Sequence, residues 1–411
     1  MHWSSGSTSA GSSDYGRGLA GKQTVSGRSG VILSIAFRPF FLLGAIFAVV
    51  SMLLWLATLH GFGWQPAVAD PVVWHAHEML FGFAGAAMAG FLLTAIATWT
   101  GRPPVSGATL GMLVAAWITG RVAMAVGQGW PEPAVAVADL AFPVLLAGLA
   151  TREILGGGSR RNFGIAGVIA GFAVLDGVFH LGSFGIWPGA GRVALFLAAH
   201  GLLVLITVIA GRIIPAFTGN WLRTRGSSRL PQSRAWLEIV IIPVAILAGI
   251  ADSVAAPAMI VAVLSITLAT LHGLRLSAWQ WRAAAAEPLV LILHVAYLWL
   301  PIGYLLLGLV ALGLPVPRSA ALHALTMGAV GTMILAVATR VALGHTGRPL
   351  TASRLTVAAY IALNVGVLVR VLSPLAPGSY FALIDTAAAG WIAAFGLFLW
   401  VYWGILTRPR N

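Results

Sequence analysis

Long apolar runs recur along the chain from Val31 to Thr407, and they limit its fold more than any other feature. Each run is long enough to cross the roughly 30 Å of hydrocarbon in a bilayer as a helix. The sequence therefore predicts an all-α, polytopic integral membrane protein with about twelve transmembrane helices. The predicted spans are residues 38–60, 74–98, 107–127, 134–155, 163–186, 192–216, 236–255, 257–278, 288–312, 319–343, 354–373 and 379–406.

The composition agrees with a chain surrounded by lipid. Hydrophobic residues make up 59% of its 411 residues and charged residues only 9%, whereas a soluble domain needs far more charge to cover its surface. The formal net charge is +13, but the arginines lie in short gaps between apolar runs, which indicates membrane topology and not a nucleic-acid partner. The chain has no cysteine, so disulfides, thiolate metal sites, iron–sulfur clusters and cysteine nucleophiles are excluded.

The first residues differ from the rest of the chain. Residues 1–30 are rich in serine and glycine and contain no apolar stretch, so they are not a signal peptide. We expect a disordered cytoplasmic tail over residues 1–30 and a transmembrane domain over 31–411. Most Lys and Arg residues lie in this tail, after even-numbered spans or at the C-terminus, which predicts that both termini are cytoplasmic. The opposite side holds only Arg121, Arg192, Arg318 and Arg370.

An internal repeat links the second and tenth predicted spans. The segments 77–103 and 323–349 align without a gap. They share the first histidine, two glycines (Gly82/Gly328 and Gly85/Gly331) and a Thr-Gly-Arg-Pro ending. A weaker third copy ends the sixth span, so the copies fall on spans 2, 6 and 10. This spacing predicts three units of four helices.

Ten histidines occur, and most lie in or beside the spans, where an ionisable ring is costly and usually functional. His77 and His323 each begin their repeat, so we expect them at the same height on equivalent helices. Two such imidazoles could supply both axial ligands of a heme, and the shared glycines would let the macrocycle approach the backbone. The alternative is a pair of histidines that cap helix starts or hydrogen-bond across helices.

His75 and His77 are two residues apart, roughly 200° around a helix, so one face cannot present both. They are expected to serve different centres. His75 and Glu78 can share a face, so Glu78 is a candidate to orient His75 as a hydrogen-bond partner. The alternative role for Glu78 is to stabilise a helix N-terminus through the helix dipole.

Two further histidines are candidates for a second metal. His200 lies about 7–8 Å deeper in the membrane than the start of its repeat, where a metal near the first would fit. His180 follows Asp176 by one helical turn, so this carboxylate could hold its imidazole N–H. A purely structural Asp–His pair is the alternative.

Three histidines, His272, His294 and His345, are assigned to the cytoplasmic half. His345 lies roughly 33 Å of helix from His323, so the two cannot ligate one metal. We expect His345 to anchor a loop or line an entry from the cytoplasm. His294 could bind a ligand, serve a proton path or be hydrogen-bonded in the core. The sequence contains no P-loop, no GxSxG elbow and no HExxH motif.

Several ordered motifs resemble the NnrS family, and the resemblance runs from about residue 31 to the end. The motifs are Ala36-Phe37-Arg38-Pro39-Phe40-Phe41, Trp74-His75-Ala76-His77-Glu78-Met79, Trp99-Thr100-Gly101-Arg102-Pro103, Pro215-Ala216-Phe217-Thr218 and Gly344-His345-Thr346-Gly347-Arg348. The resemblance implies a twelve-span protein of the bacterial inner membrane that contains heme and copper and is tied to nitric oxide and denitrification.

A fainter likeness links the chain to subunit I of heme–copper oxidases, which is similar in having twelve spans in three arcs and ligand histidines on spans 2, 6 and 10. His77, His200 and His323 occupy these spans here, and in that family spans 2 and 10 hold the low-spin heme. The His-x-His pair lies on span 2 here and not on span 10, and span 6 lacks a His-Pro-Glu-Val-Tyr-type motif. Oxygen reduction and proton pumping are therefore not inferred.

Taken with the resemblance, the sequence predicts an inner-membrane heme protein, also binding copper, that senses, binds or turns over nitric oxide or another small diatomic ligand. His77 and His323 are the predicted heme ligands, and His75, His180 and His200 are predicted for copper or a second heme. A respiratory electron donor is a candidate partner, and whether the protein is a nitric oxide-metabolising oxidoreductase stays open. The rival functions are a cofactor-free secondary transporter with histidine proton relays and an assembly factor for a respiratory complex.

Overall fold

The computed structural model describes residues 28–68, 70–158 and 160–410. The tail predicted over residues 1–30 lies almost entirely outside these residues. The described part is helical and contains no strand. Its membrane-spanning elements are α2 (Phe37–Leu59), α3–η1–α4 (Pro71–His77, Glu78–Ala84, Gly85–Thr100), α5 (Gly107–Val126), α6 (Glu132–Gly156), α7 (Phe163–Ser183), α8 (Ala190–Thr224), α9 (Ala235–Ser253), α10 (Ala258–Ser277), α12 (Pro288–Ala311), α13–η3–α14 (Arg318–His323, Ala324–Gly331, Thr332–His345), α15 (Arg354–Leu372) and α16 (Tyr380–Thr407).

These elements form twelve helices that are long and apolar enough to cross a membrane, which confirms the predicted all-α, multi-pass architecture. For eleven of them the predicted ends differ from the structure by at most three residues. The exception is span 6, predicted to end at residue 216, whose helix α8 continues to Thr224. Charged and polar residues such as Arg212 and Asn220 end the apolar run there, but they do not interrupt the helical hydrogen bonding.

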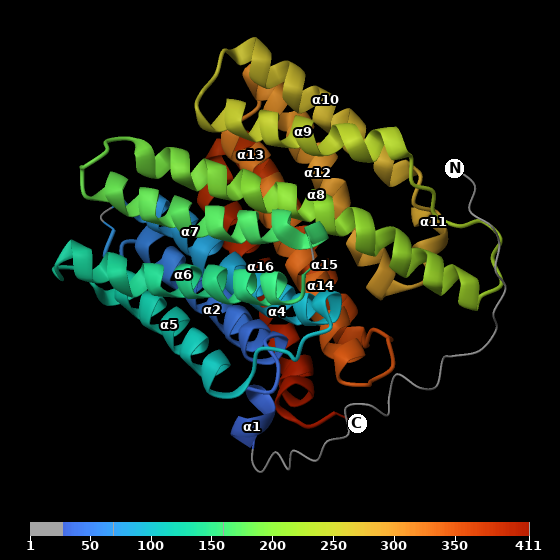
Figure 1. Cartoon of the computed structure of the whole chain (residues 1–411). Helices are drawn as coiled ribbons and strands as arrows, with labels where there is room; N and C mark the ends of the chain where they lie inside the picture. Colours follow the sequence, from blue (N-terminus) through green and yellow to red (C-terminus); the bar gives the residue numbers. More distant parts are fainter. Residues whose placement is uncertain (1–27, 69, 159, 411) are drawn as a thin grey trace.

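Spans 2, 6 and 10 meet at the centre of the bundle. Span 2 touches α8, α8 touches η3 of span 10, and α4 touches α14, while α5, α6, α7 and α8 pack side by side in sequence order (Figure 1). Spans 2 and 10 have 83% and 67% of their apolar windows buried, against 39% for six other spans. The spans that carry the sequence repeat are therefore the inner helices.

Both described ends of the chain lie on one face of the bundle. The short helix α1 (Arg28–Ile32) packs against α16, and both are drawn near each other in Figure 1. Arg38 Nη1 donates to the carbonyl oxygens of Leu406 (2.8 Å) and Arg408 (2.7 Å). An even number of spans requires this arrangement. That this face is cytoplasmic stays a prediction.

The sequence repeat is also a repeat of unusual backbone geometry. Directly after His77 the helix changes to a π-helix, η1, and directly after His323 it changes to a second one, η3. π-helical turns are rare and occur mostly at functional sites. The alignment of spans 2 and 10 is thus confirmed at the level of local structure.

Candidate functional site: a cavity and a buried charged cluster

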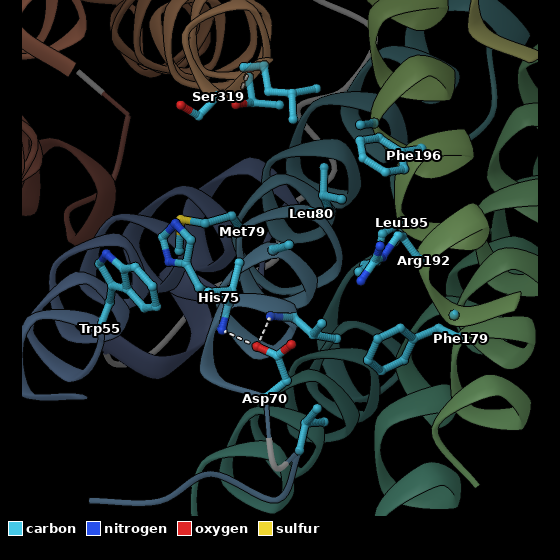
Figure 2. A pocket seen from close by; sticks show the side chains of 18 of the residues that line it. Trp55, Asp70, His75, Met79, Leu80, Phe179, Arg192, Leu195, Phe196 and Ser319 are labelled. Carbon is cyan, nitrogen blue, oxygen red and sulfur yellow. Dashed lines mark hydrogen bonds between the residues drawn. The ribbon is translucent and has the colours of Figure 1, made fainter. Parts of the chain in front are cut away.

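A cavity of about 1750 Å³ lies at the end of the bundle formed by the loops that follow odd-numbered spans. Its walls come mainly from spans 1, 2, 6, 10 and 12. Figure 2 shows His75 and Met79 on one side and Arg192 and Phe196, carried by α8, on the other. Pockets for drug-sized ligands measure about 300–1,000 Å³, so this cavity has room for a large flat molecule.

Two histidines line the cavity from the two central, matched spans. The His75 ring stacks on Trp55 with centroids 4.6 Å apart, and its Nδ1 is buried without a hydrogen-bond partner among the described residues. His323 Nδ1 donates to the carbonyl oxygen of Ser319 at 2.8 Å, which leaves Nε2 as the free lone-pair nitrogen. A backbone bond of this kind fixes the tautomer of ligating histidines.

Three arginines also line the cavity: Arg192, Arg318 and Arg370. Arg318 donates to Asp252 Oδ1 at 2.8 Å and lies over the ring of Phe196, and Arg370 donates to the Ser373 hydroxyl at 3.2 Å. Arg192 makes no hydrogen bond or ion pair with the described residues. Such a set can bind an anionic group at the rim of an otherwise apolar space.

A second constellation lies next to the cavity and is closed off from solvent. His77, Asp139, Asp176 and His180 each offer one ligand atom, and these atoms lie within 4.8 Å of one another. His77 Nε2 is 2.8 Å from Asp176 Oδ1 and 3.1 Å from Asp139 Oδ2, and His180 Nε2 is 2.9 Å from the same Asp139 oxygen. This donor set could hold a metal ion.

Two charged residues complete this buried charged cluster, defined as His77, Glu78, Arg121, Asp139, Asp176 and His180. Glu78 Oε1 accepts from His77 Nδ1 at 3.0 Å, and Arg121 forms ion pairs with both Glu78 and Asp139. The histidine and carboxylate side chains come from spans 2, 4 and 5, and the arginine comes from span 3. Gly120 permits this approach, because a Cβ there would lie 3.0 Å from Asp139 Cα.

The structure places His77 and His323, the two predicted heme ligands, in different surroundings. His77 points into the buried charged cluster, where both ring nitrogens bond to carboxylates, whereas His323 lines the cavity. His75, and not His77, lines the cavity together with His323. The expectation that residues 75 and 77 serve different centres agrees with this arrangement.

Other predicted side-chain partners also differ. Glu78 holds His77 and not His75, and Asp176 bonds His77 while His180 bonds Asp139. The predicted partners were chosen by α-helical spacing within one span, whereas the observed partners come from the π-helix that follows His77 and from neighbouring spans. The repeat glycines have different roles: a Cβ on Gly328 would lie 2.7 Å from the Trp299 ring, so this glycine serves close packing between helices, whereas Gly331 lines the cavity.

The histidines predicted for copper do not converge. His75 is on the cavity wall, His180 is in the buried charged cluster, and His200 Nε2 bonds Asp252 Oδ2 at 3.1 Å. His294 bonds the carbonyl oxygens of Val290 and Trp279, which is the core role among its predicted alternatives. His345 packs against the ring of Phe37 at 5.6 Å, at the opposite end of span 10 from His323.

Sequence reasoning missed Asp139 and Arg121 as site residues. Asp139 lies inside the predicted span 134–155, and an acidic residue within an apolar run is a signal that would have found it. Arg121 was noted as one of four arginines on the sparsely charged side. All four arginines lie in or beside the candidate site: Arg121 belongs to the buried charged cluster, and the other three line the cavity.

Twelve spans, a large cavity lined by His75, His180 and His323, and a buried charged cluster define a multi-pass membrane protein with a candidate cofactor or metal site. Residues 31–410 match the family model described as NnrS protein, and the chain belongs to the NnrS family. This confirms the resemblance seen in the sequence motifs. No curated protein matches the chain.

Proposed function

We propose that this protein binds heme in the large cavity and, through the heme, nitric oxide or a related diatomic ligand at the bacterial inner membrane. Membership of the NnrS family fits a role in the response to nitric oxide. The observation that carries the proposal is the pair His75 and His323, which reaches one cavity from the two most buried spans.

The residues present fit such a group. His323 offers Nε2 toward the cavity because Nδ1 is bonded to Ser319, and the buried Nδ1 of His75 lacks a partner within the described chain. Arg192, Arg318 and Arg370 suit the carboxylates that a heme carries. Phe83, Phe179 and other apolar side chains on the walls keep water away from the face of a macrocycle.

Each part of the chain has a distinct task in this proposal. Heme iron supplies a coordination position at which small ligands bind. His75 and His323 orient the group from opposite repeats, and the arginines offset its negative charge. Copper is proposed for the same walls, which carry the thioethers of Met52, Met79, Met124 and Met327, since soft donors of this kind suit copper(I).

The proposal also includes an orientation in the membrane and a partner. With both termini in the cytoplasm, the cavity opens toward the non-cytoplasmic side. A respiratory electron donor is required only if nitric oxide is turned over and not merely bound. The rival proposals, a cofactor-free transporter and an assembly factor, need no chromophore.

The test compares neighbouring histidines in the purified protein. We expect a Soret band in the wild type that shifts when nitric oxide is added, and loss of heme or an altered Soret band in His75→Gln and His323→Gln. His77→Gln and His345→Gln are the matched controls and should keep the wild-type spectrum. Loss of heme in His77→Gln with retention in His75→Gln would instead support His77 and His323 as the heme ligands. A colourless, functional protein would favour the transporter.

A further inference from the structure

We propose that the buried charged cluster binds one divalent transition-metal ion through His77, Asp139, Asp176 and His180. The site is separate from the cavity ligands, and it does not depend on whether the cavity holds heme. It uses two imidazoles and two carboxylates, a donor set of nitrogen and hard oxygen atoms.

The geometry is already close to that of a metal site. Ligand bonds to an ion such as zinc are about 2.0–2.2 Å, so ligand atoms around a tetrahedral centre lie roughly 3.3 Å apart. The three contacts between histidine nitrogens and aspartate oxygens measure 2.8, 2.9 and 3.1 Å, and all four ligand atoms lie within 4.8 Å. Shifts of a few tenths of an ångström for most of these atoms would admit an ion.

With neutral imidazoles and ionised carboxylates, the cluster carries a net negative charge that a metal ion or extra protons must balance. Glu78, Asp139 and Asp176 carry three negative charges against the single positive charge of Arg121, which leaves −2 with neutral imidazoles. The carboxylates are 0% exposed and the guanidinium is 5% exposed. Uncompensated charge is costly inside a membrane bundle, and a divalent cation would cancel it.

Two buried oxygen atoms are left without partners. Asp176 Oδ2 and Glu78 Oε2 accept no hydrogen bond from any described residue. Buried polar atoms rarely remain unsatisfied, so each calls for a missing group. Asp176 Oδ2 belongs to a proposed ligand, and it could become a second donor atom for the ion.

Glu78 gives His77 the orientation of a ligand. Its carboxylate accepts from His77 Nδ1–H at 3.0 Å, which directs the lone pair of Nε2 toward the aspartates. Carboxylate–histidine–metal arrangements of this kind are common around bound metals. Glu78 is therefore a positioning residue here, and His77 would be the ligand.

The site has an entry route and a chemical preference. His180 belongs both to the cluster and to the cavity wall, so an ion can reach the cluster from the cavity. Imidazole and carboxylate donors suit zinc, manganese, iron(II) or copper(II), whereas the cavity methionines suit copper(I). The competing state is a metal-free cluster that holds two extra protons.

Metal content tests the proposal directly. We expect the full-length protein, purified in detergent without chelator, to contain about one equivalent of a divalent metal beyond heme iron and the copper proposed for the cavity walls. His180→Gln and Asp176→Asn should lower this content at least tenfold. The matched control is His200→Gln, which removes a buried histidine that pairs with the single carboxylate Asp252, and it should leave the metal in place. Equal metal content in all four proteins would overturn the proposal.

A second measurement does not rely on variants that must fold. Wild-type protein stripped with chelator is titrated with Co²⁺, and visible d–d bands of a nitrogen–oxygen site should appear and saturate at one equivalent. A metal-free preparation with no such bands would mean that protons hold the cluster, and the proposal would be wrong. Loss of metal with heme retained in His180→Gln supports this site. An absent Soret band with metal retained would overturn only the heme proposal.

Discussion

The two matched spans, Pro71–Thr100 and Arg318–His345, repeat a backbone but not an environment. In each, a π-helix begins directly after the repeat histidine. In each, Nδ1 of that histidine is held by a nearby oxygen atom, from Glu78 in one span and from Ser319 in the other. The repeat therefore shares a backbone geometry and a held Nδ1, although the partner is the side chain of the following residue in one span and a backbone carbonyl four residues earlier in the other.

The surroundings of the two histidines differ in charge. The residue after His77 is Glu78, and spans 3, 4 and 5 add Arg121 and two aspartates to it. The residue after His323 is Ala324, and its neighbourhood opens into the cavity beside Arg370. One repeated backbone unit thus presents an imidazole to a closed acidic cluster in one half and to a large cavity in the other. The neighbouring spans decide the chemistry.

The largest expected effect comes from removing the one cation of the buried charged cluster. Arg121→Ala leaves the buried carboxylates of Glu78 and Asp139 without their guanidinium partner, and breaking a buried pair in this way costs about 3–5 kcal/mol. Thermal unfolding in detergent measures the loss. Arg192→Ala on the cavity wall, which breaks no ion pair, should cost about 1 kcal/mol or less. Equal losses would mean that the two environments do not differ in their need for charge compensation.

A smaller effect should distinguish the matched glycines Gly85 and Gly331. A Cβ on Gly331 would lie 2.8 Å from Trp391, which lines the cavity, whereas a Cβ on Gly85 would lie 3.3 Å from Phe142. We expect Gly331→Ala to destabilise the protein by about 1–3 kcal/mol through overpacking. Gly85→Ala should be nearly neutral, because the higher helix propensity of Ala offsets a contact that small movements relieve.

Spectroscopy gives this comparison a second readout. If the cavity holds heme, displacement of Trp391 in Gly331→Ala should also shift the Soret band. Gly85→Ala should leave the band unchanged, since Phe142 packs behind span 2 and not on the cavity wall. The reverse pattern would show that the cavity is not where the chromophore lies.

Much of this architecture could be predicted because membrane spans follow from local composition. Apolar run length predicted all twelve spans, and the match of residues 77–103 to 323–349 predicted a structural repeat of spans 2 and 10. The 200° offset of His75 and His77 predicts different surroundings for them, and in the structure His75 lines the cavity while His77 lies in the buried charged cluster. These inferences use local composition, helical spacing or the similarity of two segments, and none of them requires knowing which helices touch.

The side-chain partners could not be predicted in the same way. His77 was paired with His323 on the basis of the repeat, but its actual partners come from spans 4 and 5. Asp139 lies 62 residues after His77 in the chain. Whether its side chain points toward span 2 depends on how span 4 is rotated and packed, and hydrophobic periodicity in lipid is too weak to predict that rotation. The π-turn at Glu78 also changes the helical register just after the histidine, so α-helical spacing fails there.

The smallest effect should be equal in the two spans, because it tests the backbone that they share. Gly101 and Gly347 of the repeated Thr-Gly-Arg-Pro motif have φ of 68° and 75°, in the left-handed region where a glycine ends a helix. A non-glycine residue in this conformation costs roughly 1–2 kcal/mol, so Gly101→Ala and Gly347→Ala should each lower thermal stability by about this amount.

Asn tolerates left-handed backbone, so Gly101→Asn and Gly347→Asn should recover part of the stability lost with Ala. Nothing lies within 4 Å of a Cβ built at Gly101, so steric contact would not explain a loss there. None of these substitutions should alter metal or heme content, since Gly101 and Gly347 lie at the opposite ends of their spans from His77 and His323. If one Ala variant lost cofactor while its matched partner did not, the motif would serve more than the backbone, and the equivalence of the two helix ends would fail.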